Sequence, residues 1–108
     1  MLFRSSVVES GGKTDFQYGD DPASLYQPTK VDRVLHDGDE VQLGGTVLVA
    51  HLTPGHTKGC TTWTMKARDG VDGKTYNVVI VGSPNVNPGY KLVNNAAYPE
   101  IAQDYERA

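Results

Sequence analysis

A proline-glycine turn that carries a histidine separates two strand-like segments near the middle of this sequence. Residues 51–63 read His-Leu-Thr-Pro-Gly-His-Thr-Lys-Gly-Cys-Thr-Thr-Trp. The proline restricts the backbone before the turn, and the glycines on either side of His56 permit sharp reversals. We therefore expect a buried strand, a tight turn and a returning strand, with the imidazole of His56 presented at the open edge of a sheet.

Apolar residues elsewhere follow the periods of strands and of one helix. Strands are predicted over residues 34–35, 40–43, 46–53, 61–66 and 76–81, hairpin turns at residues 44–45 and 69–73, and a helix over residues 99–107. Both faces of residues 46–53 are apolar, which predicts a strand buried on both sides. Asp21-Pro22 offers a short helix start. The fold class is therefore α+β, mainly an antiparallel sheet with a C-terminal helix.

The composition fits one soluble, turn-rich unit. The chain has 108 residues, 12 of them glycine and 6 proline, so we expect residues 1–108 to form a single domain with a modest core. The net charge of −3 and the scattered basic residues exclude a nucleic-acid surface. No apolar run is long enough to span a membrane, and the N-terminus lacks a secretory signal. These features indicate a cytoplasmic or a truncated protein.

His56 is the first candidate for chemistry, because a rigidly presented imidazole is a common zinc ligand. The alternative is an exposed turn histidine, which the residues alone favour. His51 lies in a predicted buried strand, where a lone histidine is usually a hydrogen-bonded core residue. His36 lies in a predicted surface turn and is assigned no chemistry. The spacing of the three histidines does not force them into one zinc site.

Ser83 and Asn85 follow the strand predicted over residues 76–81, at an edge where open sheets place functional groups. Ser83 could donate a hydrogen bond to a substrate carboxylate or cap a turn, and asparagines such as Asn85 are turn formers first. Other polar or aromatic residues have simpler interpretations. Lys58 is interpreted as a solvated lysine that could bind an anion, and Trp63 and Tyr76 as core aromatic residues. Cys60 is interpreted as a small buried hydrophobic residue, and as the only cysteine it cannot form an internal disulfide.

Three segments resemble the metallo-β-lactamase superfamily. The first is residues 53–63, which contain His56. The others are residues 8–16, Val-Glu-Ser-Gly-Gly-Lys-Thr-Asp-Phe, and residues 81–92, Val-Gly-Ser-Pro-Asn-Val-Asn-Pro-Gly-Tyr-Lys-Leu, and these resemble subclass B3. Other superfamily members usually carry a metal-binding Asp or Cys where this chain has Ser83, and subclass B3 has a serine there.

This resemblance implies a partial αββα sandwich. It also implies zinc-dependent hydrolysis of the β-lactam amide by a periplasmic parent enzyme that holds two zinc ions and confers antibiotic resistance. By resemblance, His56 would be a ligand of the first zinc. Ser83 and Asn85 would line the side of the site that receives the carboxylate of the β-lactam substrate.

The family's other zinc ligands come from an upstream His-x-His-x-Asp-His motif and a downstream histidine, and this sequence contains neither. We therefore expect an internal fragment with no complete catalytic set, which binds zinc weakly or not at all and is inactive by itself. Uncovered apolar faces at Val47, Val49 and Val79 favour aggregation or self-association. The alternatives are another hydrolase of this fold, such as a thioesterase-like enzyme, and a non-enzymatic remnant.

Overall fold

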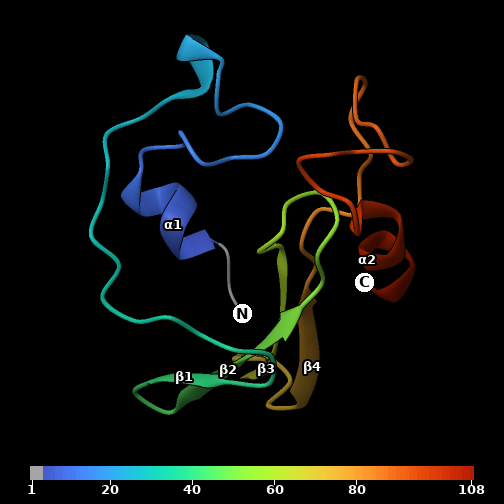
Figure 1. The fold of residues 1–108 in the computed structure, drawn as a ribbon. Coiled ribbons are helices and arrows are strands. Elements are labelled where there is room, and N and C mark those ends of the chain that lie inside the picture. The colour runs from blue at the N-terminus through green and yellow to red at the C-terminus, as the bar shows by residue number, and fades with distance from the viewer. Residues whose placement is uncertain (1–3) are drawn as a thin grey trace.

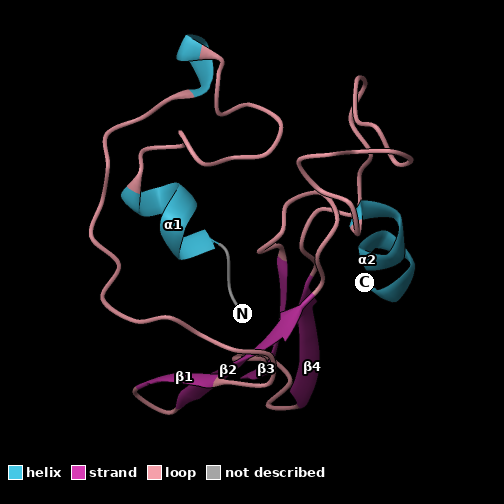
Figure 2. Cartoon of the chain, viewed as in Figure 1, coloured by secondary structure: helices cyan, strands magenta, loops and turns pink. Residues whose placement is uncertain are grey.

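The computed structural model describes residues 4–108, which form one antiparallel sheet, two short α-helices and long irregular segments (Figures 1 and 2). The elements are α1 (Arg4–Glu9), a 3-10 turn (Pro22–Ser24), β1 (Glu40–Leu43), β2 (Thr46–Leu52), β3 (Thr61–Arg68), β4 (Thr75–Ile80) and α2 (Ile101–Arg107). The predicted α+β class, with its antiparallel sheet and C-terminal helix, is confirmed. None of the helices within residues 4–108 has the length and apolar character needed to cross a lipid bilayer.

The sheet brings two functional segments to the same end. Its strands lie in the order β1-β2-β3-β4, each antiparallel to the next. Residues 44–45 and 69–74 close hairpins at one end of the sheet. The loop at residues 53–60 joins β2 to β3 at the opposite end, where β4 also finishes (Figure 1). The segments that contain His56 and Ser83 therefore leave the sheet side by side.

The N-terminal part differs from the sequence prediction. Helix α1 was not predicted, although the glycines after it are a common sign of a helix end. Gly11 and Gly12 have φ of 67° and 93°, and the Gly12 amide donates to the Val7 carbonyl at 2.8 Å. The short helix start at Asp21 is confirmed, since its carboxylate accepts from the Ala23 amide at 3.1 Å.

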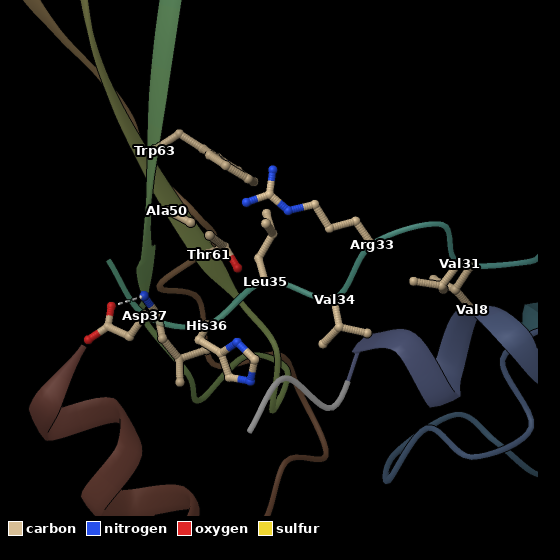
Figure 3. A pocket seen from close by; sticks show the side chains of 11 residues that line it. Val8, Val31, Arg33, Val34, Leu35, His36, Asp37, Ala50, Thr61 and Trp63 are labelled. Carbon is tan, nitrogen blue, oxygen red and sulfur yellow. Dashed lines mark hydrogen bonds between the residues drawn. The ribbon is translucent and has the colours of Figure 1, made fainter. Parts of the chain in front are cut away.

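The strand predicted over residues 34–35 is wrong. These residues lie in irregular chain, and Val34 is 46% exposed. The carboxylate of Asp37 accepts the Leu52 amide at 2.8 Å (Figure 3). The Leu52 amide of β2 is therefore bonded by the Asp37 side chain and not by the backbone of a neighbouring strand.

The core is small. The buried hydrophobic residues among those described are Ala50, Cys60, Tyr98 and Ile101. Among the described residues, the close backbone contacts between elements join neighbouring strands, and neither helix backbone lies close to a strand. The molecule is therefore open: its radius of gyration is 16.2 Å, against about 13 Å for a compact chain of this length.

The strands are less buried than the sequence predicts. Strand β2 is not buried on both sides, since its residues other than Ala50 are half-buried or exposed. Tyr76 is not a core residue, because it lies on the terminal strand β4 and is 48% exposed, while Trp63 is half-buried. The prediction of an uncovered apolar face is confirmed at Val79, which is 58% exposed. Val47 and Val49 are half-buried. A single domain over residues 1–108 stays a prediction.

Candidate functional site

The loop at residues 53–60 is held by its own backbone. The Thr53 amide donates to the Cys60 carbonyl at 2.9 Å, and the Cys60 amide donates to the Thr57 carbonyl at 3.2 Å. Pro54, Gly55, Gly59 and Cys60 are all buried. His56 is half-buried on this loop, so its imidazole is presented from a well-packed support rather than from a free turn.

The orientation of the His56 ring is set by a backbone carbonyl. Its Nδ1 lies 2.8 Å from the Asn85 carbonyl oxygen. A carbonyl only accepts hydrogen bonds, so Nδ1 donates, and in the neutral imidazole Nε2 then keeps its lone pair. Histidines that bind metals donate their other ring N–H to a carbonyl or carboxylate in the same way. In this tautomer Nε2 is the only ring atom of His56 with a lone pair to offer a cation.

Two tyrosines complete this arrangement. The Tyr90 ring stacks on the imidazole, with ring centroids 5.8 Å apart and planes 24° apart, and its hydroxyl donates to the His56 carbonyl at 3.0 Å. The Tyr105 hydroxyl donates to the Asn85 carbonyl at 2.6 Å. Burial raises the pKa of Tyr90 to about 12 and also raises the pKa of Tyr105. Both hydroxyls therefore remain protonated donors at neutral pH.

Aromatic contacts tie this site to the N-terminal segment. The Phe16 ring lies edge-on to Tyr90 and Tyr98, at centroid distances of 5.5 and 4.9 Å. The Tyr18 ring lies 6.3 Å from Tyr90. Such edge-to-face pairs contribute roughly 0.5–1.5 kcal/mol each beyond the area they bury. Residues 16–18 therefore help to hold the segment that stacks on His56.

The structure places Ser83 and Asn85 beside the His56 loop, through backbone contacts. The Ser83 hydroxyl accepts the Asn85 amide at 3.4 Å, and its carbonyl accepts the Cys60 thiol at 3.5 Å. Ser83 is half-buried and its hydroxyl bonds the backbone two residues further on, whereas Asn85 is exposed. The group that meets His56 is the carbonyl of Asn85, not its side chain. The roles of both side chains in substrate binding stay predictions.

The other polar candidates have hydrogen-bond or ionic partners of their own. The Nε2 of His51 lies 2.8 Å from the Thr64 hydroxyl, which confirms a hydrogen-bonded strand residue. His36 is exposed beside Asp39, at 3.5 Å. Lys58 is not a freely solvated lysine, because its ammonium donates to the Ala97 carbonyl at 2.9 Å and lies 5.0 Å from the Tyr98 ring centroid.

A complete zinc site is not found in the part of the chain described. Within residues 4–108, no three His, Cys, Asp or Glu side chains gather closely enough to hold a metal ion. Catalytic zinc is usually held by about three protein ligands. His56 fits the role of one such ligand, but the described residues do not supply the other ligands of a catalytic zinc ion.

One hollow, shown in Figure 3, is not lined by His56. It lies between the irregular segment that precedes β1 and the sheet, and its apolar lining includes Val8, Val31, Leu35, Leu52 and Trp63. A second hollow is lined by Thr57 and Lys58 on the His56 loop and by Phe16 and Tyr26. Neither hollow is lined by His56, Ser83 or Asn85. The candidate site therefore lies at the open edge of the sheet and not in either hollow.

The close fit between Gly55 and Tyr105 leads to a first prediction. Gly55 has a φ of 139°, and a Cβ there would lie 2.7 Å from Cγ of the Tyr105 ring. Gly55→Ala should destabilise the chain by roughly 1–3 kcal/mol, because it strains the backbone and displaces the ring. Urea unfolding measures this loss. Gly70→Ala is the matched control, since a Cβ there meets no atom within 4 Å. Equal midpoints for the two variants would contradict the prediction.

Comparison with known proteins identifies the fold. No family profile matches the sequence. The structure is similar to the native metallo-β-lactamase FEZ-1 of Legionella gormanii, with 61% identity and a TM-score of 0.91 over 95% of this chain and 38% of that one. It is also similar to the class B3 di-zinc metallo-β-lactamase LRA-12 from an Alaskan soil metagenome, with 35% identity and a TM-score of 0.85 over 95% and 38%.

A curated relative gives a coarser match of the same kind. A probable metallo-hydrolase of Burkholderia pseudomallei is 32% identical over 69 residues, which are 64% of this chain and 24% of that protein. This chain therefore has part of the metallo-β-lactamase fold. Its resemblance to subclass B3 is confirmed, and it corresponds to a segment of such an enzyme. The chain spans about 38% of the length of the solved structures and 24% of the length of the curated relative.

Sequence reasoning missed the structural roles of Tyr90 and Tyr105. Tyr90 lies in the segment that resembles subclass B3, and Tyr105 lies in the predicted C-terminal helix. Nothing in the spacing shows that two residues 15 positions apart both support the His56 loop. The available signal was limited to a tyrosine in each of these two segments.

Proposed function

We propose that this protein takes part in zinc-dependent hydrolysis of the β-lactam amide, and that His56 binds zinc through Nε2. The observation that carries the proposal is the hydrogen bond from Nδ1 to the Asn85 carbonyl, 2.8 Å long. It fixes the tautomer that leaves Nε2 available, as metal-binding histidines require. The similarity of the whole segment to FEZ-1, at 61% identity, supports a β-lactam as the substrate.

The residues of this chain would bind and orient. His56 would supply one ligand, and the polar side chains of Ser83 and Asn85 would face the carboxylate of the antibiotic. When bound, zinc supplies Lewis-acid polarisation of the carbonyl and lowers the pKa of water. LRA-12 is a di-zinc enzyme. We propose that the protein in which this segment works also holds two zinc ions. We further propose that this protein is periplasmic and confers antibiotic resistance.

Residues 1–108 alone are proposed to be inactive. A single imidazole, without further ligands nearby, cannot hold catalytic zinc at ordinary concentrations. The second candidate function is a non-enzymatic chain, and the absence of a metal-binding cluster within residues 4–108 favours it for this polypeptide in isolation. Tight binding of two zinc ions by the 108-residue chain would contradict both statements.

The substrate class is tested with two assays on the complete translated reading frame that contains residues 1–108. We expect zinc-dependent hydrolysis of the chromogenic β-lactam nitrocefin to exceed hydrolysis of a thioester by several orders of magnitude. Ser83 favours this outcome, since other superfamily hydrolases usually place a metal-binding residue there. A protein that prefers the thioester would support the thioesterase-like alternative and contradict the proposal.

A further inference from the structure

Tyr105 of α2 touches both segments that meet at His56. Its ring covers Gly55 so closely that a Cβ at that glycine would lie within 3.0 Å of three ring carbons. Its hydroxyl donates to the Asn85 carbonyl at 2.6 Å. One side chain therefore bridges the loop at residues 53–60 and the segment after β4, although neither segment belongs to its own helix.

The shared acceptor makes this bridge specific. The Asn85 carbonyl receives two donors, His56 Nδ1 at 2.8 Å and the Tyr105 hydroxyl at 2.6 Å. A carbonyl oxygen has two lone pairs, so both bonds can form together. Asn85 is exposed and lies in irregular chain, which means that the carbonyl depends on such contacts to keep its direction. The Tyr105 hydroxyl holds that direction while the ring holds the turn before His56.

We propose that Tyr105 is a positioning residue that fixes the tautomer and direction of the His56 imidazole through the Asn85 carbonyl. The proposal rests on the proposed role of His56 in binding zinc. Tyr105 is assigned no contact with substrate or metal. Its effect passes through the hydrogen bond that keeps the proton on Nδ1 and the lone pair on Nε2.

The test is the variant Tyr105→Phe, which keeps the ring over Gly55 and removes the hydroxyl. In the complete translated protein, labelled with ¹⁵N-histidine and free of zinc, long-range ¹H–¹⁵N spectra report the tautomer of each histidine. We expect His56 to be protonated at Nδ1 in the wild-type protein and to show a mixture of tautomers in the variant. The zinc dissociation constant should rise roughly 10-fold, at the lower end of the effect of losing an outer partner of a ligand.

Two further variants separate positioning from general damage. Asn85→Ala removes the side chain but keeps the carbonyl, so the His56 tautomer should remain unchanged. Tyr76→Phe removes an exposed tyrosine hydroxyl bonded to Asp72 in the distant hairpin, and it should also leave His56 unchanged. Unaltered Trp63 signals in Tyr105→Phe establish that the sheet is folded.

The outcomes are distinguishable from failure of the proposed function. An unchanged His56 tautomer in folded Tyr105→Phe overturns the positioning role, whatever the protein hydrolyses. If Tyr105→Phe unfolds the protein, the zinc-free spectra of Gly55→Ala decide, because that change displaces the same ring; an unchanged tautomer there also overturns it. A shifted tautomer supports the positioning role, even if nitrocefin is not hydrolysed.

Discussion

Replacing His56 by alanine should lower zinc affinity and β-lactam hydrolysis together in the complete translated protein. Loss of an outer partner of a metal ligand typically costs 10–100-fold, and loss of the ligand itself should cost more than about 100-fold. The reason is geometric: Nε2 of His56 is the atom left free when Nδ1 donates to the Asn85 carbonyl at 2.8 Å. Zinc content per protein and the initial rate of nitrocefin hydrolysis measure the two effects.

His36→Ala is the matched control for this experiment. His36 is an exposed histidine whose ring lies 3.5 Å from the carboxylate of Asp39, and it is placed in an irregular segment before β1. Its removal should leave zinc content and hydrolysis unchanged within error. If His56→Ala retained full zinc content and activity, or if both variants lost activity equally, the assignment of His56 as a ligand would be wrong.

The second large effect expected is self-association of the 108-residue chain through β4. Within the described residues, β4 is an edge strand of the sheet, and it carries no charged side chain. Its Val79 and Ile80 are 58% and 50% exposed. The total accessible surface is 7575 Å², against about 5,900 Å² for a compact protein of this mass. Uncharged, apolar strand edges pair with other edges. We propose that two copies pair at β4.

Val79→Lys should prevent this association, because an edge lysine opposes strand pairing. Sedimentation velocity over a concentration series should show dimers or larger species for the wild-type chain and monomers for the variant. The matched control is Val71→Lys, which changes a valine that is 98% exposed in the hairpin loop between β3 and β4. A wild-type chain that stays monomeric throughout the series would contradict this use of β4.

The regular elements of the sheet were predictable because each depends on local signals. Alternating residues give β1, and Gly44-Gly45 closes its hairpin with β2. The same argument failed for residues 34–35, where a tertiary contact decides: the Asp37 carboxylate takes the amide of Leu52. The sequence pattern also overestimated the burial of β2. Apolar residues on both faces of this strand predict a covering layer on each side, which residues 4–108 do not provide.

The candidate site was predictable in part. The Pro-Gly turn identified His56, and the resemblance to subclass B3 assigned it to zinc. The partner of its Nδ1 was not predictable, because a backbone carbonyl carries no residue-type signature and Asn85 lies 29 positions away. The helix that carries Tyr105 was predicted, but that its hydroxyl crosses to the same carbonyl follows only from the tertiary structure.

The most direct measurement is a crystal structure of the complete translated protein with zinc, with diffraction data collected at the zinc absorption edge. The predicted result is an anomalous peak about 2.0–2.1 Å from Nε2 of His56, while Nδ1 still donates to the Asn85 carbonyl. A zinc ion coordinated without His56, or one bound at its Nδ1, would contradict it.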